Sequence, residues 1–243
     1  MRIDLKNKFR RSKLGILWTV VFPLGLSAIM GTVFAIAFHY DILDYMPYVL
    51  SGILFWDLVS NTFNAGGFSL IENDSFIRQC RHPLTMYTMK RAIVSSILFL
   101  ISCIALAIWV VIRNPINILW GILSLPLTMI IYFLFSWAGT TIAGYTCVKY
   151  RDYPMMAPLV LQVIWYLSPV FFNESLFQSH PVLHMWFKIN PITRMLNLLR
   201  KPFLYGCCPN WIDYGECILF VIVLGLIAYR VNKKEEKDLI FYL

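Results

Sequence analysis

The sequence predicts an all-α integral membrane protein with six transmembrane helices, and two observations lead to this. First, the 243-residue chain is 59% hydrophobic but only 14% charged, and its mean hydropathy is +0.66. A soluble domain carries about 25% charged residues. Second, apolar runs long enough to cross ~30 Å of hydrocarbon recur along the chain. The composition therefore excludes a disordered chain, a soluble enzyme and a secreted domain built on disulfides.

Charged residues, proline or asparagine bound each apolar run. The expected spans are 14–38, 46–65, 92–112, 118–147, 155–172 and 212–229. The fifth is the least regular, because Pro158 and the pair Ser168-Pro169 interrupt it. A short span broken by proline indicates irregular backbone that is buried against protein or lines a cavity.

The positive charges predict the orientation. With six spans, one side of the membrane holds residues 1–13, the 66–91 loop, residues 148–154 and the C-terminus. Sixteen of the 21 lysines and arginines lie on that side. Because positive charge gathers in cytoplasmic segments, we expect both termini in the cytoplasm. The basic excess is thus explained by topology, and no nucleic-acid partner is expected.

The first segment outside the spans is residues 1–13. On a helix, Met1, Leu5 and Phe9 share one face while six cations cover most of the rest. This pattern predicts an N-terminal amphipathic helix that lies in the cytoplasmic interface with its cations near lipid phosphates. The alternative is a topology determinant with no further role.

The second segment is the loop after the second span. Ser69 followed by Glu72 matches a capping box, in which the serine side chain caps the start of a helix and the glutamate side chain accepts from the backbone N–H of the serine. His82-Pro83 should stop that helix, because proline disfavours helical geometry in the preceding residue. We therefore expect a short helix at 70–81, which suits the docking of a soluble partner. An ordinary interfacial turn is the alternative.

The third segment, residues 173–211, is expected on the outer side of the membrane. It is too polar to span and too aromatic for a free loop, and prolines divide it. These features predict short helices that enter the outer leaflet and return. They either cap a pathway or rest at the interface, where Trp and Tyr are enriched in any case.

The motifs of common active sites are missing. The sequence has no GxxxxGK[ST], so no P-loop of its own for ATP, and no GxSxG or HExxH. His180 and His184 have i,i+4 spacing but no third ligand near them, and the six cysteines form no CxxC pair. No residue is expected to be catalytic and none to bind a metal.

Aromatic residues, 16% of the chain, cluster in the first, second, fourth and fifth spans. Packing and interface belts account for most of them. A sharper interpretation is a stacking track for sugar rings. Sugar C–H faces pack on aromatic faces without fixed hydrogen bonds, which suits a substrate that must slide.

Six motifs in order resemble those of ABC-2 type permeases that export polysaccharides. They are Lys6–Trp18 followed by Phe22-Pro23, Tyr48–Trp56, Asn73–Pro83, Lys149–Tyr153, Tyr166–Val170, and Ile189–Thr193 followed by Arg200. The resemblance covers nearly the whole chain. Its nearest subgroup is the permeases for O-antigen and teichoic acid.

The resemblance implies a single ABC-2 transmembrane domain over 1–243, forming a homodimer with a pore between the copies. ATP and Mg would bind a separate ABC ATPase chain, with no cofactor on this chain, and a dimer of that ATPase would dock on the coupling helix at 70–81. The substrate would be polyprenyl-diphosphate-linked polysaccharide, moved outward across the bacterial inner membrane. Residues 1–13 would form the interface helix, and 173–211 would correspond to re-entrant gate helices.

The resemblance also assigns residues. It implies that the ATPase is coupled through the residues Glu72, Asn73, Ser75, Phe76, Ile77, Arg78 and Arg81. Contact with the lipid diphosphate falls to Arg10, Arg11 and Lys13. The substrate channel would include Trp18, Phe34, Tyr48, Phe55, Trp56, Trp165 and Tyr166. The gate would include Pro169, Trp186, Phe187, Asn190, Pro191 and Arg200, and a cytoplasmic motif Arg151 and Asp152.

These features predict the transmembrane subunit of an ATP-driven exporter of lipid-linked polysaccharide. An ABC-2 exporter of a drug or small lipid is one alternative. A membrane acyl- or glycosyltransferase is another, but it needs a catalytic histidine or carboxylate pair that the sequence does not show.

Overall fold

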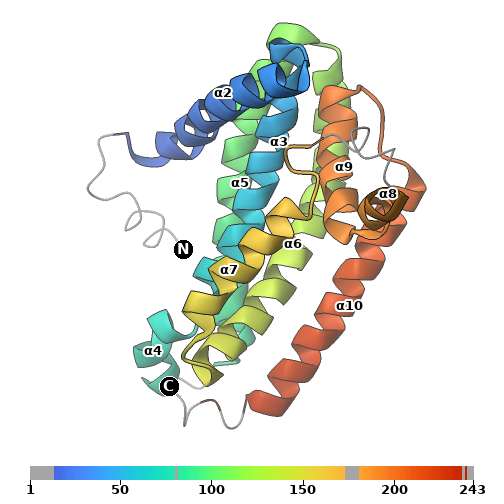
Figure 1. The fold of residues 1–243 in the computed structure, drawn as a ribbon. Helices are drawn as coiled ribbons and strands as arrows, with labels where there is room; N and C mark the ends of the chain where they lie inside the picture. The colour runs from blue at the N-terminus through green and yellow to red at the C-terminus, as the bar shows by residue number, and fades with distance from the viewer. Residues whose placement is uncertain (1–13, 80–81, 173–180, 237–238, 240–243) are drawn as a thin grey trace. The chain divides into compact units, whose positions relative to one another are not determined.

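The protein is described here by a computed structural model that places residues 14–79, 82–172, 181–236 and 239. All regular elements within these residues are helical (Figure 1). The helices, in chain order, are η1 (Gly15–Leu17), α2 (Trp18–Phe38), α3 (Ile42–Ser60), η2 (Asn61–Ala65), η3 (Ile71–Asn73), α4 (Asp74–Gln79), α5 (Thr85–Arg113), α6 (Asn117–Lys149), α7 (Tyr153–Tyr166), α8 (Pro181–Ile189), α9 (Pro191–Leu204) and α10 (Trp211–Glu235).

Five helices among the described residues are long and apolar enough to cross a membrane. They cover Gly15–Phe38, Ile42–Ala65, Thr85–Arg113, Asn117–Lys149 and Trp211–Glu235. Each contains all or nearly all of one expected span. The chain is therefore an all-α, multi-pass membrane protein, as the sequence predicted.

The expected fifth span at 155–172 differs. Helix α7 ends at Tyr166 after 14 residues, which gives a length of about 21 Å against ~30 Å of hydrocarbon. Pro158 lies near the start of α7 and does not break it. The helix stops because Ser168-Pro169 follows, and proline has no N–H and excludes helical geometry before it. Residues 167–172 form turns and bends instead.

The expected capped helix at 70–81 is also different at its start. The chain forms a 3₁₀ turn, η3, before α4 begins at Asp74. The prediction of a capping box is wrong, because the buried Ser69 hydroxyl has no hydrogen-bond partner and no side chain caps η3. Leu70, fully buried beside Ser69, explains this, since an apolar side chain at that position draws the backbone inward. Arg81 lies outside the described residues.

The chain divides into two compact units. The first unit draws on Met1–Trp56, Leu98–Thr128 and Trp165–Cys217, and the second on Asp57–Ile97, Met129–Ile164 and Ile218–Leu243. Helices α3, α5, α6, α7 and α10 each contribute residues to both.

Close helix packing in the first unit depends on small residues. A Cβ at Gly121 of α6 would lie 2.6 Å from Cε1 of Phe203 on α9, which is closer than carbon atoms approach. The glycine therefore lets α9 pack directly on the α6 backbone. Contact through small residues is the usual means of helix association in lipid, where burial from water does not drive it.

Polar side chains join the helices of the second unit. The Thr62 hydroxyl donates to Ser136 Oγ at 2.9 Å, and the Thr88 and Thr141 hydroxyls lie 2.9 Å apart. Such pairs hold α5, α6 and the end of the α3–η2 span together because hydroxyls within the bilayer need partners.

Candidate functional site

Helix α4 combines a buried residue with an exposed one. Ile77 is 7% exposed and packs in a cluster that includes Leu70, Tyr145 and Leu239 of the second unit. Its neighbour Phe76 is 61% exposed. Successive helical residues point ~100° apart, so anchoring Ile77 turns Phe76 outward. The exposed face of α4 therefore carries one large apolar side chain, Phe76, among polar residues.

Charged residues around α4 are held by intrachain contacts. Arg78 Nε lies 2.7 Å from Asp74 Oδ1, one helical turn away, and Arg91 Nη1 of α5 lies 3.5 Å from Glu72 Oε2. The Asn73 amide donates to the Ser69 carbonyl at 2.7 Å. Of the expected coupling residues, Glu72, Ser75, Phe76 and Arg78 are exposed.

Aromatic rings of the first unit form a continuous series. Trp56 and Trp165 lie 6.2 Å apart between ring centroids, Trp165 and Phe171 lie 4.8 Å apart, and Phe171 and Phe34 lie 5.7 Å apart. From Phe34 the contacts continue through Phe38, Tyr40, Tyr45 and Tyr48. Tyr166 joins the series through Trp165, so the structure brings together five of the expected channel rings: Phe34, Tyr48, Trp56, Trp165 and Tyr166.

Exposure divides the expected channel rings into two groups. Tyr166, beside Trp165, is 61% exposed, and Trp18 is 46% exposed. Phe55 is fully buried, and Tyr48 is nearly so. A sugar ring can stack only on an accessible face, so Phe55 and Tyr48 serve as interior packing in this structure.

Arg200 of α9 is buried in the first unit, at 3% exposure. Its guanidinium donates to the Tyr48 hydroxyl at 2.9 Å and to Ser51 Oγ at 3.1 Å, both on α3. It also donates to the carbonyls of Pro169 at 2.7 Å and Val170 at 2.8 Å. The guanidinium carbon lies 3.7 Å from the centroid of the Tyr48 ring. These neutral partners satisfy a buried charge that would otherwise be costly.

Side chains from three helices hold the irregular segment 167–172. Asn190 caps α9, accepting from the Ile192 N–H at 2.9 Å, while its amide donates to Ser168 Oγ at 3.1 Å. The Trp186 indole N–H of α8 donates to the Leu167 carbonyl at 2.9 Å. The Tyr45 hydroxyl of α3 donates to the Phe171 carbonyl. Backbone groups left unpaired by the end of α7 thereby gain partners.

Four expected gate residues, Pro169, Trp186, Asn190 and Arg200, therefore converge on this segment. Pro191 occupies the first turn of α9, where its missing N–H costs nothing. Phe187 is buried. Tyr45 and Ser51 complete the arrangement. Sequence reasoning missed both, because no local pattern connects them to their partners, which lie 126 and 149 positions away.

Comparison with known proteins decides the family. The profile described as "ABC-2 type transporter" matches residues 1–204. The chain belongs to the ABC-2 type transporter family. Two proteins of Klebsiella pneumoniae, each named "O-antigen export system permease protein RfbA", are 22% identical to this ABC-2 permease over 233 residues. These alignments cover 95% and 94% of the permease and 88% and 86% of the relatives.

A third relative, from Myxococcus xanthus, has the same name. It is 20% identical over 207 residues, which cover 82% of the permease and 76% of the relative. The family indicates a transport permease rather than an enzyme, and it implies an ABC ATPase as partner.

The two residues expected to form a cytoplasmic motif lie in the turn between α6 and α7. Arg151 and Asp152 are exposed. Asp152 also lines a cavity of about 590 Å³ in the second unit, whose other walls are mostly apolar. Tyr153 closes one side, and its hydroxyl donates to the Phe63 carbonyl at 3.0 Å.

A charged cluster at the start of α10 was also missed. Asp213, 2% exposed, pairs with Lys201 and lies 3.6 Å from Arg194, and its carboxylate accepts from the backbone N–H of Asn210 at 3.0 Å. In the sequence, only the position of this acid at the edge of the last apolar run indicated the cluster.

The expected diphosphate contacts Arg10, Arg11 and Lys13 lie outside the described residues of the permease.

Proposed function

We propose that this permease is the transmembrane subunit of an ATP-driven exporter of polyprenyl-diphosphate-linked O-antigen polysaccharide. It moves the polymer from the cytoplasmic to the outer side of the inner membrane. The observation that carries the proposal is the similarity to O-antigen export permeases over 76–88% of their own length.

The proposed topology has six spans, with both termini in the cytoplasm. Helix α7 together with residues 167–172 makes the fifth crossing. Irregular backbone is tolerated there because α3, α8 and α9 satisfy its carbonyls. Helices α8 and α9 form the re-entrant gate, and residues 1–13 form an interface helix whose Arg10, Arg11 and Lys13 contact the lipid diphosphate.

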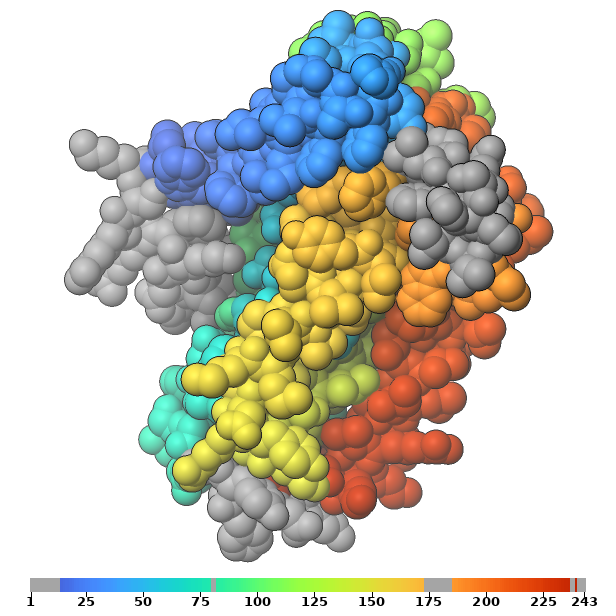
Figure 2. Space-filling view, viewed as in Figure 1, coloured from blue at the N-terminus to red at the C-terminus, as the bar shows by residue number. Residues whose placement is uncertain are grey.

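Two copies of the permease form the transporter. An exposed apolar stripe on α7, made by Met155, Leu159 and Val163 at successive helical turns, supports this. Figure 2 shows α7 (yellow) uncovered on the viewed face. The stripe has the spacing of a helix face that packs against lipid or another helix.

The sugars slide along the accessible rings, Trp56, Trp165, Tyr166 and Phe34, which present flat apolar faces without fixed hydrogen bonds. The ATPase, which carries ATP and Mg, docks on the exposed side of α4 around Phe76. Closure of the ATPase dimer then moves α4 and, through the buried Ile77, the helices of the second unit.

Deleting the gene and fractionating lipid-linked glycan tests the proposal. Undecorated cell surfaces and lipid-linked polymer retained inside the cell are expected, with recovery on expression of the intact chain. Polymer that still reaches the surface at the normal level in the deletion strain overturns the function. Co-purification of an ATPase subunit with the tagged permease tests the partner separately.

A further inference from the structure

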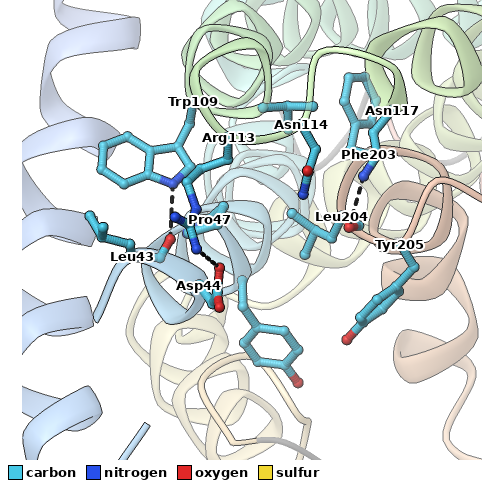
Figure 3. A pocket seen from close by; sticks show the side chains of 12 residues that line it. Leu43, Asp44, Pro47, Trp109, Arg113, Asn114, Asn117, Phe203, Leu204 and Tyr205 are labelled. Atoms are coloured by element: carbon cyan, nitrogen blue, oxygen red, sulfur yellow. Dashed lines mark hydrogen bonds and ion pairs between the residues drawn. The ribbon is translucent and has the colours of Figure 1, made fainter. Parts of the chain in front are cut away.

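A second cavity lies in the first unit, with a volume of about 310 Å³. The first turns of α3, the last turns of α5, the start of α6 and the end of α9 enclose it (Figure 3). The volume is at the lower end of the ~300–1,000 Å³ of small-molecule pockets, so it suits a ligand the size of one ring.

Two of its walls are fixed by contacts within the chain. Arg113 of α5 pairs with Asp44 of α3, and the Asn117 amide of α6 donates to the Leu204 carbonyl at 3.0 Å. Gly206, at φ +62°, lets the chain turn past Asn117, because a Cβ there would overlap the Asn117 side chain. The cavity is therefore shaped before any ligand arrives.

The polar groups of the cavity have unused hydrogen-bonding capacity. The Asn114 amide points into the space that Asp44 and Leu204 border (Figure 3), and within the described residues its side chain makes no hydrogen bond. The Asp44 and Arg113 side chains are 70% and 39% exposed despite their pairing. An amide, a carboxylate and a guanidinium together offer both donors and acceptors.

Aromatic rings supply the apolar surface. Trp109 is held by its indole N–H, which donates to the Leu43 carbonyl at 3.4 Å, and Tyr205 projects its ring from the end of α9 (Figure 3). Tyr205 is 60% exposed, so a face of its ring is accessible. The cavity thus combines flat apolar surface with groups that bind hydroxyls.

We propose that this cavity binds a single sugar ring. Sugar hydroxyls both donate and accept, which matches the three polar side chains, and the C–H face of the ring packs on Trp109 or Tyr205. A simple anion is a poorer fit, because Asp44 already neutralises Arg113. A purely apolar ligand would leave the Asn114 amide without a partner. The inference rests on the proposed function for the presence of glycan near the permease.

Sugar binding is measured on the full permease–ATPase complex in lipid nanodiscs without ATP. Methyl glycosides of hexoses and N-acetylhexosamines serve as probes in saturation-transfer NMR and titration. Asn114→Ala should weaken binding roughly fivefold to tenfold through one lost hydrogen bond, and Tyr205→Leu should do so through the lost ring face. Asn210→Ala is the matched control, since that side chain is also without a hydrogen bond but lies outside the cavity.

The inference is overturned if no probe binds saturably, or if the Asn114→Ala and Asn210→Ala variants bind equally well. Surface polymer in cells carrying the Asn114→Ala variant distinguishes the source of the sugar. Reduced polymer shows that the ring belongs to the exported glycan, whereas unchanged polymer with lost binding shows a free or neighbouring glycan. Sugar binding in nanodiscs does not require export, so the binding result does not depend on whether the proposed export function is correct.

Discussion

Arg200 shows how one side chain can hold an irregular membrane segment. Replacing it with Ala removes the donor of the Val170 carbonyl and the shorter of two hydrogen bonds to the Pro169 carbonyl, at about 1–3 kcal/mol for each buried group. We expect a total loss of about 2–5 kcal/mol of stability, because two buried carbonyls lose a charged donor while no charge is left unpaired. Arg200→Lys should retain part of it, because lysine keeps the charge but not the planar fork. The midpoint of thermal unfolding in detergent measures the effect.

Lys188→Ala is the control for this substitution. Lys188 is an exposed cation on α8 in the same unit, and its removal should leave the unfolding midpoint unchanged. A midpoint for the Arg200→Ala variant that matches this control would show that the segment 167–172 does not depend on the guanidinium.

The sequence identified Arg200 as a gate residue but not its partners. Ser51 lies 149 positions away and Pro169 lies 31 away. A buried arginine needs several acceptors, yet nothing in the local pattern says which carbonyls these will be. The sequence can show that an arginine will need acceptors. Which groups supply them depends on how α3, α9 and the end of α7 pack together.

Helix α4 separates a docking residue from a folding residue. Phe76→Asp removes an exposed apolar side chain, so we expect the permease to fold normally while ATP hydrolysis and export become uncoupled. Ile77→Ala instead empties part of the buried cluster and should cost roughly 2 kcal/mol of stability. ATPase co-purification, ATP hydrolysis and thermal unfolding are measured on both variants.

Phe76→Leu serves as the conservative control, since it keeps an apolar contact. Normal coupling in the Phe76→Asp variant would contradict the docking assignment of α4. Loss of folded protein in that same variant would contradict the exposure of Phe76.

Packing of α9 on α6 depends on one glycine. Gly121→Ala places a methyl group against the buried Phe203 ring, at an expected cost of about 1–3 kcal/mol from overpacking. Helix propensity returns at most ~1 kcal/mol, so the net effect is destabilising. Gly215→Ala on α10 is the matched control, because no atom lies within 4 Å of its added Cβ. Equal unfolding midpoints for the two variants would show that α6 and α9 separate easily.

Apolar runs predicted the long helices well because the thickness of the bilayer imposes the same minimum length on each. The predictions at 155–172 and 70–81 were less accurate for opposite reasons. Ser168-Pro169 ended α7 early, although the apolar composition continued through Phe171 and Phe172. Ser69 had the right spacing for a cap, but burial of Leu70 beside it decided the local backbone.

At the scale of the whole molecule, composition identified the environment and the distribution of residues identified the family. Low charge and high hydropathy indicated a membrane protein, and no feature of composition indicated its cargo. The ordered motifs did, and several of them mark the end of an element: Lys149–Tyr153 joins the end of α6 to the start of α7, and Asn190-Pro191 begins α9. The 310 Å³ cavity escaped prediction because four separate helices contribute its residues.

The nature of the cargo makes the final prediction. A polymer must pass every accessible ring many times, whereas a small lipid crosses once. Losing one stacking contact of about 40 Å² costs ~1 kcal/mol, or roughly fivefold at each step. Tyr166→Ala should therefore reduce export of long polymer more than export of short oligosaccharide on the same lipid. Tyr166→Phe should restore both, since the ring is kept.

The chain-length distribution of surface glycan measures this effect, with Trp211→Ala as control. Trp211 is 88% exposed at the start of α10 and makes no contact with the ring series, so its loss should not change the distribution. If the Tyr166→Ala variant exports long and short glycan equally well, the rings act as packing and not as a track. Unchanged glycan together with measurable export of a small lipophile by both the wild type and the Tyr166→Ala variant would instead favour the small-lipid alternative, because a cargo that crosses once does not need repeated stacking.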